Sequence, residues 1–360
     1  RKRADMSRFF SQQFASLTPY TPGEQPRDQQ YVKLNTNESP FPPSPGVLSA
    51  VAEESARLNL YCDPECTQLR QQAAELYGVQ PENVLPVNGS DEALYITFLA
   101  FGDGAHPFAY PEISYGFYPV FSRLTQVPAR EIPLKSDFTV DVQDYLGIDE
   151  NIVLANPNAP TGVCLSLSEI ERLVRANPER LVVIDEAYID FGGESCVPLV
   201  HRYSNLLVIQ TFSKSRSLAG ARLGFAIGCE ELIRDLNTIK YSINPYNVNR
   251  MTQAAGVAAI RDNAYYAGSA QTIIRTRERA ACALEQLGFT VLPSKANFLF
   301  AASAAVDGET LYRELKARGV LVRHFTKPLI QNFCRITIGT DGQMEILLDR
   351  IQEILSEKGS

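Results

Sequence analysis

Short apolar runs alternate with helix-like segments through the middle of this chain, and that alternation limits the fold more than any other feature. The strand candidates are the apolar runs at 84–87, 107–110, 127–133, 152–155, 181–184, 206–211 and 223–227. The last four are nearly continuous in apolar residues, which is typical of strands covered on both faces of a largely parallel sheet. We therefore predict an α/β fold whose large domain, residues 47–245, holds a mostly parallel seven-stranded sheet.

The segments that flank this region differ from it. Residues 1–46 are polar and rich in proline, so we expect an extended arm that lies over another surface. Beyond Pro245 a long helical region runs to Leu287, and shorter elements follow it: strand candidates at 297–301, 320–324 and 335–338, and helices at 309–316 and at the C-terminus. We predict a smaller α+β domain over residues 246–360, with the arm packed against it.

The helix candidates carry recognisable end signals. Ser166 stands three residues before Glu169, which is the spacing of a capping box, and Ile170, Leu173 and Val174 follow on one face. Two earlier helices are expected at 46–58 and 67–76, the second of them ended by Gly78.

The bulk composition excludes several classes of protein. The 360 residues are 45% apolar and 21% charged, as in an ordinary soluble globular enzyme. The formal net charge of -7 disfavours nonspecific binding to nucleic acid or anionic lipid, and no apolar run approaches the length of a membrane span. Residues 1–6 are basic but no apolar run follows them, so we expect no secretory signal, and Met6 could be the natural start.

Cysteine and histidine usage indicates free thiols in a reducing cytoplasm. The seven cysteines are odd in number and fit no disulfide framework. Cys62 and Cys66 have no second cysteine pair and no histidine nearby, and the chain has only three histidines, so we expect no metal site.

One lysine stands in an unusual setting. Lys214 lies between Ser213 and Ser215 at the end of an apolar run, and a Gly-Ala-Arg-Leu-Gly stretch follows it. An ammonium group is costly to bury unless something uses it. One use that fits is a Schiff base with the aldehyde of pyridoxal phosphate, the hydroxyls and Arg222 serving the phosphate. The alternative is a surface lysine at a strand-to-loop junction.

Two other strand ends add polar groups. After the run 84–87, Gly89 makes a turn ahead of a helix whose first N–H groups could bind an anion, although Ser90 or Asp91 could equally be a plain N-cap. After the run 181–184, Asp185 could face a pyridine nitrogen and keep it protonated, or could simply cap the strand end.

A turn and a late strand complete the set of candidate site segments. The turn 156–162, Asn-Pro-Asn-Ala-Pro-Thr-Gly, offers amide side chains to a phenolic oxygen, although these are also the commonest turn residues. Arg335 stands inside an apolar strand, where its planar fork could bind a carboxylate or phosphate, or could form a structural salt bridge.

The order of these segments and their shared position at strand ends are more specific than any one of them. Over nearly its whole length the chain resembles the fold-type-I pyridoxal-phosphate-dependent aminotransferases, and within them it is most similar to the histidinol-phosphate aminotransferase family. The narrower resemblance rests on Tyr61 and on segments 34–40, 88–92, 111–115, 185–188, 211–224 and 335–339.

The resemblance implies a role for each residue that would hold the cofactor. Lys214 would form the internal aldimine and shuttle a proton between Cα and the cofactor. Asp185 would hold the pyridine nitrogen, Tyr188 would hydrogen-bond the phenolic oxygen and Tyr115 would stack on the ring. The phosphate would be bound by Gly89, Ser90, Ser213 and Arg222. Asp91 would be a further contact of the cofactor.

The resemblance also implies substrate contacts and a partner. Arg335, with Arg323 as a second cation, would bind the anionic group of the substrate, and Asn37 is a further expected substrate contact. A homodimer with shared sites is implied, with the arm packing on the partner subunit as well. Tyr61 would reach the cofactor phosphate of the partner, and Tyr20, in the arm, would contact the substrate of the neighbouring subunit.

One position departs from the family pattern. Where the family usually has an asparagine that meets the phenolic oxygen of the cofactor, this chain has Ala159, and asparagine stands one residue earlier. Either Asn158 or Asn156 reaches the ring, or Tyr188 serves alone; of these, Asn158 is the expected cofactor contact.

The implied reaction is a ping-pong transamination of L-histidinol phosphate with 2-oxoglutarate in histidine biosynthesis, through a Schiff base on Lys214. Two alternatives share the fold: an aromatic amino acid aminotransferase, and a phosphothreonine decarboxylase, a lyase that would release carbon dioxide. The residues leave the choice between imidazole and phenyl substrates open. A protein that only binds a ligand would have no need of Lys214, Asp185 and Arg222 together.

Overall fold

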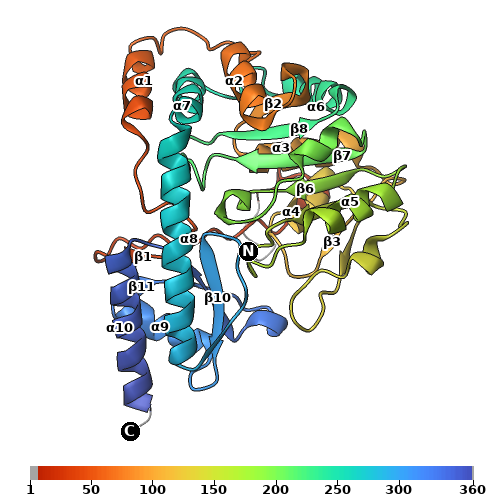
Figure 1. The fold of residues 1–360 in the computed structure, drawn as a ribbon. Coiled ribbons are helices and arrows are strands. Elements are labelled where there is room, and N and C mark those ends of the chain that lie inside the picture. The colour runs from red at the N-terminus through yellow and green to blue at the C-terminus, as the bar shows by residue number, and fades with distance from the viewer. Residues whose placement is uncertain (1–6, 359–360) are drawn as a thin grey trace.

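The computed structural model describes residues 7–358; residues 1–6, where the basic start of the arm lies, and residues 359–360 are outside the described range. A seven-stranded sheet forms the centre of the molecule (Figure 1). Its strands, in chain order, are β2 (Val84–Val87), β3 (Phe108–Pro111), β4 (Ala129–Ile132), β5 (Asn151–Ala155), β6 (Val182–Asp185), β7 (Leu206–Thr211) and β8 (Gly224–Gly228).

The order of the strands across this sheet is β2-β8-β7-β6-β5-β3-β4. Each neighbouring pair from β7 to β4 is parallel, whereas β8 runs antiparallel to both β7 and β2. The predicted mostly parallel seven-stranded sheet is therefore confirmed, with one reversed strand. Because β5, β6 and β7 are adjacent and parallel, their carboxyl ends meet at one edge of the sheet, where ligands of such sheets bind.

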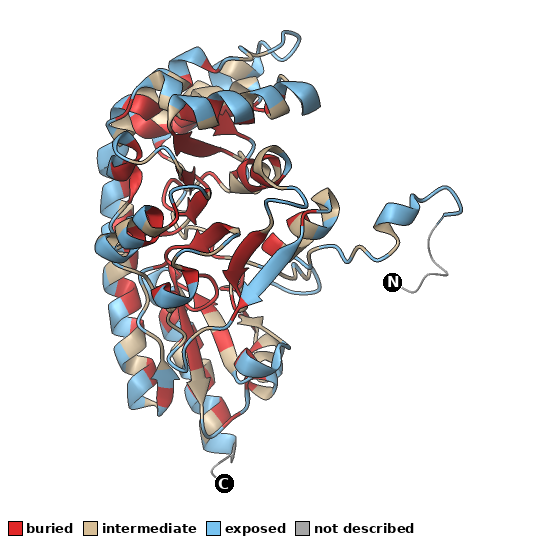
Figure 2. Ribbon diagram, turned by 90° about the vertical axis from the view of Figure 1, so that its right-hand side faces the viewer, coloured by how far each residue is buried: buried red, intermediate tan, exposed pale blue. Residues whose placement is uncertain are grey.

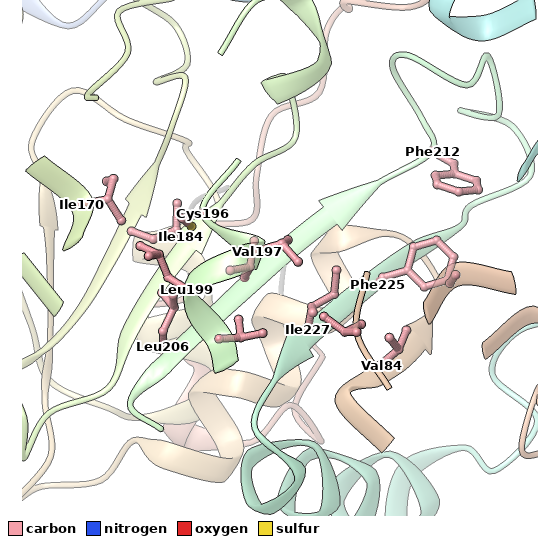
Figure 3. Packing of buried hydrophobic residues seen from close by; sticks show 14 of the residues in the cluster. Val84, Ile170, Ile184, Cys196, Val197, Leu199, Leu206, Phe212, Phe225 and Ile227 are labelled. Atoms are coloured by element: carbon pink, nitrogen blue, oxygen red, sulfur yellow. The ribbon is translucent and has the colours of Figure 1, made fainter. Parts of the chain in front are cut away.

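Helices cover both faces of the sheet, which explains why its central strands are buried at every position and mostly apolar. On one face, α2 (Thr67–Tyr77), α5 (Leu167–Ala176) and α7 (Arg250–Arg261) pack against inward side chains such as Ile184 and Ile227 (Figure 3). On the other, α3 (Ser90–Phe101), α4 (Tyr118–Thr125) and α6 (Glu230–Ile243) pack against Val183 and Ile209. Figure 2 shows the resulting buried layer of strands between helices with exposed outer sides.

A second, four-stranded sheet lies below the first in Figure 1 and is antiparallel, in the order β12-β13-β10-β9. Its elements are β9 (Phe289–Val291), β10 (Phe298–Ser303), β12 (Arg323–His324) and β13 (Phe333–Thr337), with α9 (Gly308–Ala317) and α10 (Asp341–Lys358) beside them. From the arm, β1 (Val32–Lys33) pairs in parallel with β11 (Val320–Leu321), so that residues from the two ends of the chain lie side by side.

A long helix connects the two sheets. In α8 (Asn263–Gln286), Tyr266 packs in the core of the large sheet, whereas Ile273 and Leu284 pack in the core of the small one. The predicted boundary between domains, at residues 245 and 246, falls in the loop between α6 and α7, and it stays a prediction. The helix α1 (Pro45–Ser55) packs on α7.

The local signals locate most elements to within two residues. β2 and β7 have the predicted bounds, and the capping box at the start of α5 is present, with Ser166 accepting from the Glu169 N–H and the Glu169 carboxylate accepting from the Ser166 N–H. Two differences stand out: the long helical region is two helices that part at Asp262, and β9 has no counterpart in the prediction.

Gly224 tests how closely β8 approaches the start of α3. A Cβ there would lie 2.7 Å from the Ser90 nitrogen, 2.8 Å from the Gly89 carbonyl carbon and 3.0 Å from the Gln210 carbonyl oxygen, all backbone atoms that cannot move aside. We expect Gly224→Ala to lower the free energy of unfolding by about 1–3 kcal/mol in urea denaturation.

The matched control is Gly268→Ala, at an exposed position of α8 where no atom lies within 4 Å of the added Cβ. That change should raise the free energy of unfolding by roughly 0.5–1 kcal/mol, because alanine favours helix more than glycine does. Equal urea midpoints for the two variants would contradict the close approach of β8 and α3.

Candidate active site

A cavity of about 170 Å³ opens where β5, β6 and β7 end. The register places Asp185, the last residue of β6, beside Ala155 on β5 and Ile209 on β7. Eight residues that the sequence assigned to a cofactor line this one cavity, although they come from four separate segments: Ser90, Asp91, Tyr115, Asp185, Tyr188, Ser213, Lys214 and Arg222.

Asp185 is a nearly fully buried carboxylate at the end of a fully buried strand. Its Oδ2 accepts a hydrogen bond from the Tyr118 hydroxyl at 3.1 Å, and its Oδ1 accepts from the Ala187 N–H at 3.2 Å. Burial raises the pKa of this carboxyl to about 7, although both hydrogen bonds oppose the shift. A positively charged group in the cavity would therefore find a carboxylate that gains from pairing with it.

Lys214 lies on the loop after β7, half-buried, with its side chain on the cavity wall. Its Nζ is 5.8 Å from the centroid of the Tyr188 ring. The loop around it is held in shape by hydrogen bonds from Ser215 to Asp190 and between the hydroxyls of Ser217 and Ser39. The amine is thus presented to the cavity by a fixed loop, as a nucleophile must be.

The opposite end of the cavity is built to hold an anion. Ser90 is the first residue of α3, so N–H groups of the first helical turn and the positive end of the helix dipole meet there. Arg222 lies beside them; a Cβ on Gly89, which has φ +82°, would come 2.6 Å from its Nη2. That nitrogen also pairs with Asp91 Oδ2 at 3.1 Å, which keeps the guanidinium over the helix start.

The donor set fits pyridoxal phosphate. The helix start with Arg222 and Ser213 matches a phosphate, Asp185 matches a protonated pyridine nitrogen, and Lys214 matches an aldehyde carbon. Tyr115, whose hydroxyl donates to Asp91 Oδ1 at 2.7 Å, is placed to cover a ring.

The hydroxyl of Tyr188 has a partner that the sequence assigned elsewhere. Asn37, expected as a substrate contact, is buried, and its Nδ2 donates to the Tyr188 hydroxyl at 2.9 Å. Asn37 lines neither this cavity nor its neighbour, so the structure brings it to Tyr188 and not to the substrate side.

Neither asparagine of the turn 156–162 reaches the cavity. Asn158, the expected cofactor contact, donates from Nδ2 to the Ile113 carbonyl at 2.9 Å and to Thr161 Oγ1 at 3.1 Å, and its Oδ1 accepts from Ser114 at 2.9 Å. Asn156 is used in the same way by the backbone of Leu165. Ala159 is the turn residue on the cavity wall, and the structure favours the alternative in which Tyr188 serves alone.

A second cavity, of about 350 Å³, shares Tyr115 and Ala159 with the first. Arg335 and Arg323 line it. The Arg335 Nε is buried without a hydrogen-bond partner, its Nη2 donates to the Asn35 carbonyl at 3.1 Å, and burial lowers the pKa of the guanidinium. A half-buried cation with an unused buried donor and no salt-bridge partner is a site for an anion from outside the chain.

Tyr20 lines the same second cavity. It stacks on Phe117 at a centroid distance of 4.2 Å, and burial raises the pKa of its hydroxyl, while Arg335 and Arg323 oppose that shift. Tyr20 thus stands at the second cavity of its own chain, and the expected contact with the substrate of a neighbouring subunit stays a prediction. Tyr61, by contrast, lines neither cavity and is 79% exposed.

The residues on or behind the cavity wall that were not predicted include Thr36, Glu38 and Tyr118. Glu38 is half-buried, and despite that burial, hydrogen bonds from Lys33 and Thr36 hold its pKa below the usual value. The signal for Glu38 was its place in the segment 34–40. For Tyr118 the sequence offered none, since its contact with Asp185 joins residues 67 positions apart.

Other features of the described residues bear on what the site can do. No group of three or more metal-ligating side chains occurs among residues 7–358. All seven cysteines are free, and none of the helices in this range is long and apolar enough to cross a membrane.

Comparison with known proteins extends these observations. The chain matches the family described as aminotransferase class I and II over residues 29–351. It is 49% identical over 352 residues to the histidinol-phosphate aminotransferase of Brachyspira hyodysenteriae, covering 97% of this chain and 99% of the relative. It is 50% identical over 350 residues to histidinol-phosphate aminotransferase 1 of Bradyrhizobium diazoefficiens, covering 97% of this chain and 100% of the relative.

The fold has counterparts among solved structures. The crystal structure of the histidinol-phosphate aminotransferase from Sinorhizobium meliloti, in complex with pyridoxal 5'-phosphate, superposes with a TM-score of 0.88. The match covers 98% of this chain and 99% of that chain at 22% identity, so it supports the architecture alone.

The raised pKa of Asp185 gives a signed prediction for stability. In the protein alone its pKa, about 7, lies above the unfolded value of 3.8, so the unfolded chain releases this proton first as the pH rises. The carboxyl therefore lowers stability progressively between about pH 4 and pH 7. When both proteins are free of bound small molecules, the Asp185→Asn variant should have the higher free energy of unfolding at pH 8, by at most about 4 kcal/mol.

The measurement is urea denaturation of both proteins across this pH range. The difference should vanish near the acid end, and the similarly raised pKa of Glu186 cancels because that residue is the same in both proteins. A difference that stays constant from pH 4 to pH 8 would show that the carboxyl is not held in its neutral form by burial.

Proposed function

The chain belongs to the class I and II aminotransferases, and from this premise we propose that it transfers the amino group of L-histidinol phosphate to 2-oxoglutarate in histidine biosynthesis. The predicted family and fold class are confirmed. The observation that carries the proposal is the pair of joined cavities: one presents Lys214 and Asp185, and the other holds Arg335, whose Nε has no hydrogen-bond partner.

Pyridoxal phosphate would be held at three points. Arg222, Ser90 and Ser213 would bind its phosphate, Asp185 its pyridine nitrogen, and Lys214 its aldehyde carbon. When bound, the cofactor supplies an electrophilic carbon for an amine and a ring that withdraws electrons from the substrate carbon losing its proton. Tyr115 would cover one face of that ring and exclude water from it.

The proton transfers fall to Lys214. Once the substrate amine has taken its place, Nζ is free to accept the proton from the substrate Cα and to return it on the cofactor side. Asp185 stays ionised in this state, because a cation beside a carboxylate stabilises its charged form. Tyr188 donates its hydroxyl proton toward the phenolic oxygen.

The second cavity would hold the anionic end of both substrates. Histidinol phosphate carries a phosphate ester and glutamate carries carboxylates, and the Arg335 fork matches either group. Arg323 adds a second positive charge and is itself held by the Thr21 and Pro22 carbonyls of the arm. One cationic site thus suits both halves of a ping-pong reaction.

We place the working enzyme in a homodimer. Several large apolar side chains are exposed, among them Leu58, Leu60, Tyr61, Ile243 and Tyr246, and they form one region because Tyr61 stacks on Tyr246 at 4.5 Å. A cluster of exposed apolar side chains of this kind is typical of an interface. A second copy of the chain would cover it and bring Tyr61 toward the cofactor phosphate of that copy.

The arm supports the same proposal. Its first described residues project from the body of the molecule, with Phe9 81% exposed (Figure 2).

A reducing cytoplasm is the compartment that fits seven free thiols.

Lys214→Ala tests the central role of the lysine. We expect the variant to keep its fold and to bind pyridoxal phosphate without a covalent bond, while turnover falls by at least about 10³-fold because no other amine is positioned to move the proton. Reduction with borohydride should attach the cofactor to the unaltered protein at Lys214, as seen by peptide mass spectrometry.

The control is Lys135→Ala, which removes a surface lysine paired with Asp141 and should change neither result. Near-normal turnover of Lys214→Ala, or a reduced adduct on another lysine, would sink the assignment.

Arg335→Leu tests the anion site. Removing this half-buried cation from its anionic ligand should lower kcat/KM by about 10²- to 10³-fold with histidinol phosphate and with glutamate alike. Arg335→Lys should recover only part of the loss, because lysine lacks the planar fork. The surface variant Arg350→Ala serves as the control, and a loss confined to one substrate would refute a shared anion site.

A further inference from the structure

We propose that Asn37 and Thr337 are positioning residues that aim the hydroxyl proton of Tyr188 into the cofactor cavity. This inference rests on the proposed function, because it concerns the acceptor that pyridoxal phosphate would bring to that cavity. Neither residue lines the cavity, so each would act through Tyr188.

The hydrogen bonds in this group run in one direction, and Asn37 Oδ1 is the acceptor that the structure gives the Thr337 hydroxyl. The backbone N–H of Asn37 donates to Thr337 Oγ1 at 2.9 Å, and an N–H can only donate. The Thr337 hydroxyl therefore has its proton free, and gives it to Asn37 Oδ1 at 3.0 Å. With its oxygen used, the Asn37 amide must turn its NH₂ group to the Tyr188 hydroxyl, at 2.9 Å.

The consequence for Tyr188 is that its own proton has no use in this group. A phenol has one proton to donate, and the NH₂ group of Asn37 cannot accept it. Tyr188 lines the cofactor cavity, so the proton points to whatever acceptor lies there. The chain of donors thus runs in one direction, from Thr337 through Asn37 to Tyr188 and into the cavity.

This arrangement matters more here because Ala159 offers no hydrogen bond. The described residues that line the cavity include no asparagine or glutamine, so no carboxamide is available to the phenolic oxygen. Tyr188 is then the neutral donor on which the electronic state of that oxygen depends, and the orientation of its hydroxyl becomes decisive.

The group is rigid and dry. Asn37, Asn297 and Thr337 are at most 3% exposed, so water does not replace their hydrogen bonds. Asn37 holds a left-handed backbone, φ 57°, and its carbonyl accepts from Asn297 Nδ2 at 2.9 Å. Asparagine tolerates this conformation better than most residues with a Cβ.

The strand that starts the chain of donors also carries the anion site. Arg335 and Thr337 are two residues apart on β13, so their side chains project from the same face. Arg335 points to the substrate cavity and Thr337 to Asn37. The strand that would bind the substrate anion is therefore also the strand that determines the direction in which the Tyr188 hydroxyl proton points.

Asn37→Gly is the sharpest test, because glycine keeps the left-handed backbone and deletes only the amide. The readout is the pH midpoint of the absorbance change of bound pyridoxal phosphate, which reports how well the ionised phenolic oxygen is stabilised. We expect the midpoint to rise by about 0.5–1 pH unit, the size of one lost hydrogen bond. Cofactor release should also become faster, measured by dialysis.

A double-mutant cycle separates positioning from general damage. Tyr188→Phe should raise the midpoint by itself, and adding Asn37→Gly to it should change the midpoint no further, because the amide acts only through the hydroxyl. Thr337→Val should raise the midpoint as well, whereas Thr337→Ser, which keeps the hydroxyl, should leave it unchanged. The Thr337 pair keeps the test decisive if Asn37→Gly does not fold.

Each outcome has one meaning. A midpoint equal to that of the unaltered enzyme in Asn37→Gly, or in Thr337→Val, would overturn the inference, as would shifts of Asn37→Gly and Tyr188→Phe that add in the double variant. An unaltered protein that binds no pyridoxal phosphate and transfers no amino group would instead overturn the proposed function.

Discussion

A buried carboxylate at the end of a central strand is the constraint on which the site depends. β6 lies in the middle of the sheet with helices on both faces, so its last residue, Asp185, opens into a protected cavity and not into solvent. Burial makes the ionised form costly, and only the Tyr118 hydroxyl and one backbone N–H compensate it. A cationic pyridine ring would complete that compensation, which couples the fold of the sheet to the choice of cofactor.

The arm is the second structural requirement. Residues 20–37 pass from the substrate cavity, where Tyr20 stacks on Phe117, to the buried turn at Asn37. On the way, β1 pairs with β11, and the Asn35 carbonyl accepts from Arg335. A polar, proline-rich segment thus positions Arg335 and Tyr188, the residues proposed to meet the substrate and the cofactor, although it contributes little to either core.

Much of the central sheet and of the cavity at its edge could be predicted from the sequence, because buried parallel strands have nearly continuous apolar runs. The polar residue that ends such a run, Asp185 or Ser213, must lie at the ligand-binding edge, so local pattern and topology together indicated the cavity. What escaped prediction depends on contacts between distant residues. The hydrogen bond from Tyr118 to Asp185 joins residues 67 positions apart, so no local sequence pattern indicates it. The strand β9 has only three residues, which is too short for a recognisable alternation of apolar and polar residues.

The turn at 156–162 shows the limit most clearly. Its composition offered Asn158 to the cofactor, but in the folded chain the Asn158 amide closes the turn on Ile113 and Thr161. The family resemblance assigned Asn37 to the substrate, yet in the structure its amide lies against the Tyr188 hydroxyl. In both cases the residue type was informative and the direction of the side chain was not, because packing decides that direction.

The most direct test of the central claim is a single half-reaction. The cofactor-bound enzyme is mixed, without any oxo acid, with histidinol phosphate, phenylalanine or phosphothreonine, and the absorbance of the cofactor is followed with time. We expect fast conversion to the amino form with histidinol phosphate and much slower conversion with phenylalanine. A preference for phenylalanine, or release of carbon dioxide from phosphothreonine, would contradict the account.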